Sequence, residues 1–323
     1  MSASIQVQIR AIRYEAQGIL SYELRPPPGS EGAELPPFTA GAHVDVHLRD
    51  GMVRSYSLLN DDAERGRYVI AVNKDPNGRG GSRYMHEALK AGDSLAISAP
   101  RNNFALDEEG RHSIMIAGGI GITPLWSMVQ KLERLERSWE LHYSARTRQH
   151  AALLDRLEQL RPDARRRVHV NFDHEPGARM LDLAAIVSAS APDAHFYCCG
   201  PTGMLKAFEE ATASRDARFV HLEHFGGAAA AASAQGGFTV HLARAGRDVA
   251  VPAGSSILDA LLAAGVDVAH SCMEGVCGSC EVAVLEGVPE HRDLVLTRVE
   301  KEKNRSIMVC CSGCKGERLV LDL

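Results

Sequence analysis

The sequence lacks the features that define several common classes of protein. Aromatic residues make up only 5% of its 323 residues, and 36 Lys and Arg against 41 Asp and Glu give a net charge of −5 at pH 7. This balance argues against a protein whose main task is to hold nucleic-acid phosphates. No run approaches the roughly 18 apolar residues that span a bilayer, and the N-terminus lacks the basic start and apolar stretch of a secretory signal. We therefore expect a cytoplasmic protein without nucleic-acid or membrane partners, whose mature chain begins near Met1.

Several short catalytic motifs are also missing. The sequence contains no P-loop G-K-[ST], no G-x-S-x-G elbow and no H-E-x-x-H pair, which removes the common hydrolase and phosphotransfer mechanisms. The 14 histidines form no metal-binding pattern in the sequence. We expect His43 and His47, which share one face of a predicted strand, to be surface residues.

The length allows two or three domains, and 45% hydrophobic with 24% charged residues is typical of a globular protein. The first hundred residues contain short β-rich segments separated by turns rich in Pro and Gly, with few helix signals. This pattern predicts an antiparallel barrel or sandwich. The clearest of these segments are 44–48, 67–72 and 94–98.

The pattern changes near Ser113, where strands begin to alternate with helices. This alternation predicts a doubly wound parallel sheet. We expect Thr123 to cap the first helix and Pro124 to be its first residue. The predicted strands are 113–117, 139–144, 167–172 and 194–199.

A third unit follows a stretch of Gly, Ala and Ser. Residues 226–237 have almost no side chains to pack and are predicted to form a flexible linker. Strands are expected at 238–242 and 248–251, followed by a helix at 257–264 that Ser256 caps.

The cysteines are unevenly placed, because six of the eight fall in the last 52 residues. Cys272-x4-Cys277-x2-Cys280, followed by 29 residues and then Cys310, has the spacing of a plant-type 2Fe–2S site. Zinc is the alternative, because Cys277-x2-Cys280 and Cys311-x2-Cys314 form a double C-x2-C pattern, although zinc would leave Cys272 unused. Disulfides are disfavoured in a reducing compartment. Strand alternation across 307–311 would send Cys310 and Cys311 to opposite faces, so that only one of them meets the cluster.

Three Gly-containing segments suit phosphate groups. Residues 77–82 offer glycines, a basic side chain and a hydroxyl, which suit a phosphate nest, although on this segment alone a plain hairpin turn is the stronger interpretation. Gly119-x-Gly121 follows a strand and precedes a helix, as in a dinucleotide fingerprint, but Pro124 stands where the third glycine is expected. Cys199-Gly200-Pro201 lies at the carboxyl end of a predicted strand, the edge at which open α/β sheets bind ligands.

Taken together and in order, these motifs resemble the phthalate dioxygenase reductase family. This family includes vanillate demethylase reductases and belongs to the ferredoxin–NADP reductase superfamily. The resemblance covers essentially the whole chain. It is carried by Arg54-x-Tyr56-Ser57-Leu58, Gly78-Arg-Gly-Gly-Ser82, Ala117-Gly-Gly-Ile-Gly-Ile-Thr-Pro124, Tyr197-Cys-Cys-Gly-Pro201, His221-Leu-Glu-His-Phe-Gly226, the four spaced cysteines and the ending Val320-Leu-Asp-Leu323.

The resemblance implies an FMN-binding barrel at 1–103, an NAD-binding domain at 104–225 and a C-terminal β-grasp ferredoxin domain at 238–323. Ser57, Tyr56 and Phe225 are implied to act at the flavin ring, with Phe225 covering it where the nicotinamide binds. The implied flavin contacts are Arg54, Ser55, Tyr56, Ser57, Ala71, Val72, Asn73, Gly80, Gly81, Ser82 and Phe225. The implied NADH contacts are Gly119, Thr123, Cys199, Gly200 and Pro201, and the implied cluster ligands are Cys272, Cys277, Cys280 and Cys310.

Two departures from the family pattern are visible. Asn73-Lys74 stands where two basic residues are expected, and Ser312-Gly313-Cys314 replaces the usual Ser-Arg-Ala or Ser-Arg-Cys. The first puts one flavin contact in doubt, and the second alters the surface near the cluster. Arg146, just beyond the second strand of the parallel sheet, is placed to meet the 2′-phosphate of NADPH, although the resemblance favours NADH.

The implied activity is electron transfer. NADH gives two electrons at once and a 2Fe–2S centre takes one, so a flavin must convert between them. The implied partner is a Rieske-type terminal oxygenase acting as an aromatic-ring dioxygenase or O-demethylase, met transiently by a monomeric reductase. Residues 238–323 carry nine Lys and Arg against twelve Asp and Glu. This mild excess of negative charge is expected to steer the domain towards a basic patch on its partner. The alternatives are a monooxygenase partner with a non-aromatic substrate, and a zinc-bearing nucleotide-binding module without catalysis.

Overall fold

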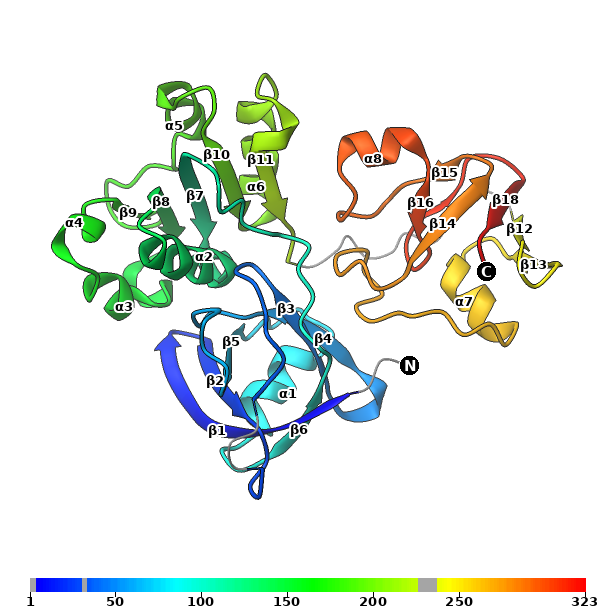
Figure 1. The fold of residues 1–323 in the computed structure, drawn as a ribbon, viewed down its shortest axis with the longest axis horizontal. Coiled ribbons are helices and arrows are strands. Elements are labelled where there is room, and N and C mark those ends of the chain that lie inside the picture. The colour runs from blue at the N-terminus through cyan, green and yellow to red at the C-terminus, as the bar shows by residue number, and fades with distance from the viewer. Residues whose placement is uncertain (1–3, 31–33, 226–236) are drawn as a thin grey trace. The chain divides into compact units, whose positions relative to one another are not determined.

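The computed structural model describes residues 4–30, 34–225 and 237–323. It divides into two compact units whose boundary in the chain lies between Glu223 and His224. The first unit holds a barrel and a parallel sheet, and the second holds the cysteine-rich domain (Figure 1). Apart from Gly237, the predicted linker at 226–237 lies outside the described residues. Among the helices of the described ranges, none is both long and apolar enough to cross a membrane.

The barrel is a six-stranded antiparallel sheet in the order β4-β3-β6-β1-β2-β5. A bridge between Leu58 and Ile70 and a hydrogen bond from Leu59 N to Val69 O (2.9 Å) join its first and last strands. Side chains that alternate inward from each strand fill the interior. The strands are β1 (Ile5–Ala16), β2 (Ile19–Arg25), β3 (His43–His47), β4 (Val53–Ser57), β5 (Tyr68–Asn73) and β6 (Ser94–Ile97), with a short 3-10 turn at Arg49–Gly51.

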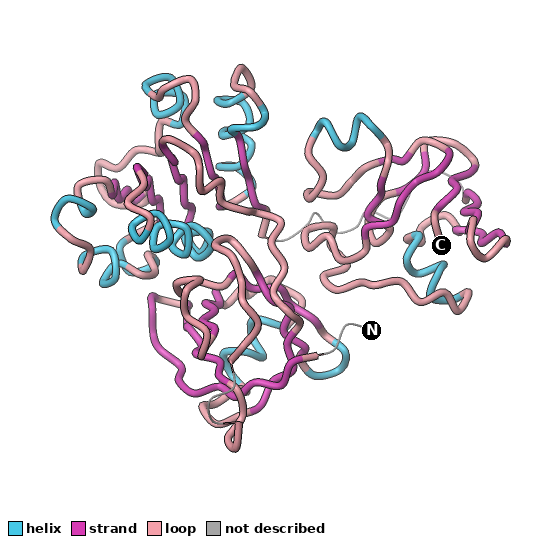
Figure 2. The backbone as a smooth tube through the Cα atoms, in the orientation of Figure 1, coloured by secondary structure: helices cyan, strands magenta, loops and turns pink. Residues whose placement is uncertain are grey.

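The barrel also contains a helix that the sequence did not indicate. Helix α1 (Gly81–Glu87) is the α-helix among the strands of residues 5–97 in Figure 2. It packs on the barrel through Met85, whose carbonyl accepts a hydrogen bond from the buried Tyr22 hydroxyl (2.7 Å). His86 Nε2 lies 2.8 Å from the Val72 carbonyl and ties the helix to β5.

The expectation for His43 was wrong. Its side chain is only 5% exposed, whereas that of His47, at the other end of the same strand β3, is exposed as expected. Burial lowers the pKa of His43 to about 4, and the nearby Arg101 guanidinium adds to this effect. His43 is therefore a neutral interior group.

The second part of the first unit is the expected parallel sheet, ordered β11-β10-β7-β8-β9. Helix α2 covers one face over Trp139, Leu141 and Tyr143, and α5 and α6 cover the other over Ile114 and Phe196. The elements are β7 (His112–Gly118), α2 (Ile122–Arg134), β8 (Ser138–Ala145), α3 (Leu154–Glu158), α4 (Pro162–Arg165), β9 (Val168–Phe172), α5 (Leu183–Ala189), β10 (His195–Cys199), α6 (Thr202–Thr212) and β11 (Val220–Glu223), with 3-10 turns at Gly119–Gly121, Arg148–His150 and Ala217–Phe219.

The start of α2 differs from the prediction. A 3-10 turn at Gly119–Gly121 runs directly into the helix, which begins at Ile122. Thr123 is therefore inside the first turn and does not cap it, and its hydroxyl donates to the Ile120 carbonyl (3.0 Å). The glycines allow the tight turn to start the helix two residues earlier than the Thr-Pro signal indicated.

The second unit has a mixed five-stranded sheet, ordered β13-β12-β18-β14-β16, and a two-stranded ribbon β15-β17. Ser256 caps α7 as predicted, its hydroxyl accepting from Asp259 N (3.0 Å). The elements are β12 (Phe238–Leu242), β13 (Arg247–Val251), α7 (Ile257–Ala263), β14 (Glu281–Glu286), β15 (Pro289–Glu290), α8 (Arg298–Lys303), β16 (Ser306–Met308), β17 (Gly313–Cys314) and β18 (Arg318–Leu321).

The prediction that a strand continues through Cys310 and Cys311 was wrong. Strand β16 ends at Met308, and the two cysteines lie in a turn where the Cys311 and Ser312 N–H groups donate to the Met308 carbonyl. Strand alternation therefore does not separate their sulfurs, and the two thiols are in hydrogen-bond contact.

Candidate functional site

Strand β4 carries the group best suited to a flavin ring. The side chain of Ser57 is buried, 4% exposed, and its hydroxyl has no hydrogen-bond partner in the described part of the chain. Leaving a buried hydroxyl unpaired costs about 1–3 kcal/mol. The hydroxyl therefore fits a bound polar group that would complete it, as predicted for the flavin.

The neighbouring residues on β4 have different surroundings. Burial raises the pKa of the Tyr56 phenol, so its half-buried ring stays neutral and can stack against an aromatic ligand. Ser55 donates its hydroxyl to Asp45 Oδ1 (2.7 Å), and Asp45 also pairs with Arg101 (2.6 Å). Because the Ser55 hydroxyl is already bonded to Asp45, Ser55 can contact a ligand through its backbone groups.

A cradle for an anion forms where α1 begins. Arg54 lies along this loop, donating to the carbonyls of Val53 (2.7 Å) and Arg79 (3.3 Å). A Cβ on Gly81 would lie 2.7 Å from Arg54 Cγ and Nε, so only glycine leaves room for the guanidinium there. Gly80 has a φ of 88°, which glycine adopts freely.

Ser82 completes this cradle from the first turn of α1. Its hydroxyl accepts from Asp75 N (3.1 Å), which holds the loop before the helix against it. The guanidinium of Arg54, the glycine backbone and this hydroxyl are the donors that a phosphate needs.

The remaining flavin candidates are on β5. Ala71 and Val72 are buried, whereas Asn73 at the end of the strand is exposed. Lys74, the second residue of the departure noted above, forms an ion pair with Glu87 (2.9 Å) across to α1. The departure therefore leaves the Asn73 side chain, and not a second cation, at this edge.

The NADH candidates lie at the carboxyl edge of the parallel sheet, where the loops after β7 and β10 pack tightly together. A Cβ on Gly121 would lie 2.2 Å from the Cys199 carbonyl oxygen, and one on Gly118 would lie 2.5 Å from Pro201 Cδ. A Cβ on Gly200 would lie 2.7 Å from the sulfur of Met204. These glycines serve close packing of the two loops.

Gly119 differs from these packed glycines. Its φ is 55°, and a Cβ there would meet nothing within 4 Å. Its backbone therefore faces open space beside the start of α2, where a pyrophosphate can approach.

A buried carboxyl that the sequence analysis did not assign lies at the same edge. Glu223 ends β11 directly opposite Cys199 on β10, and the two side chains form a hydrogen bond. Burial raises the pKa of Glu223 to about 8, and its Oε2 atom finds no partner among the described residues. Burial also raises the pKa of the Cys199 thiol, which is therefore not a nucleophile. The only signal in the sequence was the position of Glu223 at the end of a strand within the His221–Gly226 motif.

A second unassigned carboxylate follows β9. Asp173 accepts from the Ser144 hydroxyl (2.7 and 2.8 Å) and from the Asn171 amide (2.6 Å). These contacts fix a negative charge beside the end of β8. Arg146, in the loop just beyond β8, is exposed.

The cysteine loop has the form expected of a cluster site. Hydrogen-bond contacts connect Cys272 to Cys277 and to Cys310, and Cys310 to Cys280. All four are at most 6% exposed. The Glu274 N–H points at the Cys272 sulfur (3.3 Å), as N–H donors to cluster sulfurs do. All eight cysteines are free thiols.

The two spare cysteines differ in their surroundings. The Cys311 thiol is in hydrogen-bond contact with that of Cys310, and a Cβ on Gly275 would lie 2.5 Å from its sulfur. Cys314, on β17, directs its thiol at the Arg318 carbonyl (3.6 Å). The structure thus brings the four predicted ligands together, with Cys311 beside Cys310 and Cys314 bonded elsewhere.

Phe225 follows the first unit in sequence and belongs to the second. It is 42% exposed. Its position over a flavin stays a prediction.

Comparison with known proteins agrees with this division of sites. The chain matches the models of three families, the oxidoreductase FAD-binding domain at residues 31–106, the oxidoreductase NAD-binding domain at 115–210 and the 2Fe–2S iron–sulfur cluster binding domain at 240–315. These matches confirm a flavin barrel, an NAD-binding sheet and a 2Fe–2S domain, and they favour iron–sulfur over zinc at the cysteines.

Whole-length relatives are also found. The chain is 54% identical over 321 residues to the phenoxybenzoate dioxygenase subunit beta of Ectopseudomonas oleovorans, covering 99% of this chain and 98% of that protein. It is 41% identical over 323 residues to phthalate dioxygenase reductase of Burkholderia cepacia, covering 99% and 97%. A solved structure of a phthalate dioxygenase reductase, described as modular for electron transfer from pyridine nucleotides to 2Fe–2S, aligns with a TM-score of 0.73 at 40% identity, covering 99% and 98%.

Proposed function

The chain belongs to the phthalate dioxygenase reductase family, and on that premise we propose that it is the reductase component of a Rieske-type oxygenase system that acts on aromatic compounds. When bound, NADH supplies a hydride, a flavin takes up two electrons and releases them singly, and a 2Fe–2S cluster accepts one. The observation that carries this proposal is that one chain holds three sites, each suited to one of these groups. They are the Ser57 hydroxyl with the Arg54 cradle, the open backbone at Gly119, and the four converging cysteines.

The residues of the barrel are assigned to hold FMN. The Arg54, Gly81 and Ser82 cradle would hold a terminal phosphate, and the orphan Ser57 hydroxyl would donate to the ring. This cradle lies against β4, the strand that carries the ring contacts, as a mononucleotide requires. Identification of the flavin released from the purified protein by chromatography tests this, and FAD would contradict it.

The parallel sheet is assigned to NADH. Gly119 admits the pyrophosphate, and Cys199 with its partner Glu223 lines the edge beside it. Asp173 puts a carboxylate, a hydrogen-bond acceptor for ribose hydroxyls, beside the end of β8, where a 2′-phosphate would be repelled. NADH is therefore favoured over NADPH, even with Arg146 nearby.

The four cysteines Cys272, Cys277, Cys280 and Cys310 would ligate the cluster, which is the exit of the electron path. The domain that carries them has a small excess of acidic residues, which would steer it to a basic surface of the oxygenase. Such contacts are small and transient. We assign residues 1–103, 104–225 and 238–323 to the three domains and 226–237 to the linker.

The test separates the two halves of the path. Cys272→Ser should abolish electron delivery to a one-electron acceptor protein while NADH still reduces an artificial two-electron acceptor at the wild-type rate. Cys314→Ser is the matched control, because Cys314 is as buried as the ligands, 1% exposed, yet outside the set. Equal loss of both activities in Cys272→Ser, or loss of iron in Cys314→Ser, would overturn the assignment.

A further inference from the structure

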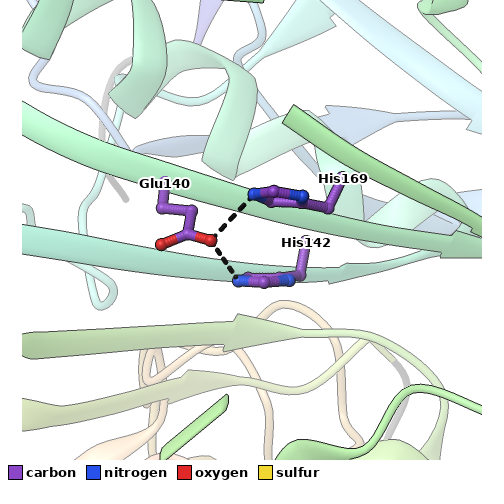
Figure 3. Close-up of side chains that lie close together, drawn as sticks. All are labelled: Glu140, His142 and His169. Carbon is purple, nitrogen blue, oxygen red and sulfur yellow. Dashed lines mark ion pairs between the residues drawn. The ribbon is translucent and has the colours of Figure 1, made fainter. Parts of the chain in front are cut away.

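Three side chains that play no part in the proposed electron path meet on one face of the parallel sheet. Glu140 and His142 are two residues apart on β8, so both point to the same face. His169 on the edge strand β9 is the direct register partner of His142. Figure 3 shows the two imidazoles side by side, both directed at one oxygen of Glu140.

The three potential ligand atoms are already close. Glu140 Oε1 lies 3.0 Å from His142 Nε2 and 2.8 Å from His169 Nε2. The rings are stacked, with centroids 4.8 Å apart and planes at 18°, so both Nε2 atoms face the same point. All three ligand atoms lie within 4.8 Å of one another. Ligands at the usual zinc distances of about 2.0–2.1 Å stand about 3.3 Å apart. The carboxylate oxygen therefore has to move up to about half an ångström away from each imidazole nitrogen, and the two imidazole nitrogens, within 4.8 Å of each other, have to take up the same spacing.

The surroundings also suit a metal ion. The His142 side chain is 12% exposed, that of Glu140 34% and that of His169 50%. The site is thus anchored on the sheet and open to solvent on one side, which leaves room for water as a further ligand.

We propose that Glu140, His142 and His169 bind one zinc ion, with water completing a tetrahedral site. Two imidazoles and one carboxylate are a ligand set typical of zinc, and they suit borderline divalent ions over Mg²⁺ or Ca²⁺. The ion would clip the edge strand β9 to β8, next to the Ser144–Asp173 contact at the end of the same strands. The sequence hides this site, because His142 and His169 are joined by strand register and not by spacing.

The experiment uses the holoprotein with flavin and cluster loaded, so that the ligand cysteines are occupied. Equilibrium dialysis against zinc chloride, with metal analysis, should find one zinc per chain beyond the iron. His169→Gln and Glu140→Gln should each raise the dissociation constant at least about tenfold. His241→Gln is the matched control, because His241 also pairs with a carboxylate, Asp248 (2.6 Å), but has no second imidazole in that pair.

A second measurement identifies the ligands directly. The oxidised flavin and the oxidised cluster give no electron paramagnetic resonance signal. When Cu²⁺ is added as a probe, the whole spectrum therefore comes from the bound copper. The wild-type spectrum should show coupling to two nitrogens, and His169→Gln should show one fewer. Zinc binding that is unchanged in both His169→Gln and Glu140→Gln, or no zinc bound by the holoprotein, would overturn the proposal. NADH oxidation at the wild-type rate by each variant shows that it is folded.

Discussion

Ser57→Ala gives a prediction whose sign differs between the flavin-free and the flavin-bound protein. In the structure the Ser57 hydroxyl is buried and unpaired within the described residues. Removing it from the flavin-free protein removes a desolvated polar group and should raise the free energy of unfolding by about 1 kcal/mol. In the flavin-bound protein the same substitution would remove the hydrogen bond that we propose the hydroxyl donates to the ring.

The magnitude of the second effect follows from the net strength of a hydrogen bond. A neutral hydrogen bond contributes about 0.5–1.5 kcal/mol, and about 1.4 kcal/mol corresponds to a tenfold change in an equilibrium constant. Flavin affinity, or the rate at which NADH reduces the flavin, should therefore fall about 2- to 12-fold. Urea unfolding of the flavin-free protein, fluorescence titration with flavin and stopped-flow reduction measure the three quantities.

Ser113→Ala is the matched control. Ser113 lies near the start of β7, is fully buried, and its hydroxyl is likewise unpaired in the described structure. It should give a similar gain in stability without any change in flavin affinity or reduction. The reasoning is refuted if Ser57→Ala destabilises the flavin-free protein, or if both variants leave flavin binding and reduction untouched.

Three further predictions concern the nucleotide and phosphate edges. The pKa of Glu223 is raised from 4.5 to about 8, so the folded protein holds a proton that the unfolded chain releases, and stability should fall as pH rises from about 4.5 to 8. Glu223→Gln should flatten this part of a plot of unfolding free energy against pH. An unchanged slope in the variant would contradict the prediction. Gly81→Ala places a Cβ 2.7 Å from Arg54 Cγ and Nε and should weaken flavin binding about tenfold in a titration. Gly203→Ala is the control and should leave flavin binding unchanged, because a Cβ there meets nothing within 4 Å. Gly121→Ala sets a Cβ 2.2 Å from the Cys199 carbonyl oxygen. It should lower the free energy of unfolding in urea by at least about 1–3 kcal/mol and raise the KM for NADH. Wild-type values of both would contradict the prediction, because they would show that the loops after β7 and β10 can separate.

Much of the fold was predictable because each element has a local signature. Strand 238–242 was predicted with the bounds that the structure gives, and Ser256 caps α7 as expected. Where the prediction failed, residues next to the predicted signal in the chain changed where the helix or strand began or ended. Thr123 lost its capping role because glycines started the helix earlier, and the strand ended at Met308 before the cysteine pair. His43 is buried and His47 exposed although the two lie on one face of β3, so alternation along the strand could not tell them apart.

The candidate site divides in the same way. Motifs with fixed spacing were visible because most of their ligands or donors come from one short segment, such as Cys272, Cys277 and Cys280 in one loop and the Arg54–Leu58 segment. Glu223, Asp173 and the Glu140, His142 and His169 group were not, because their partners lie on neighbouring strands that are distant in sequence.

The sequence by itself determined the order of the domains, the kinds of group they hold and the four cysteines that suit a cluster, because each depends on residues close together in the chain. Only the tertiary structure decided which side chains meet across strands. Parallel pairing sets Glu223 against Cys199 and His169 against His142, and burial there moves the pKa of Glu223 to about 8. Strand register and desolvation are properties of the assembled sheet, and no single segment carries them.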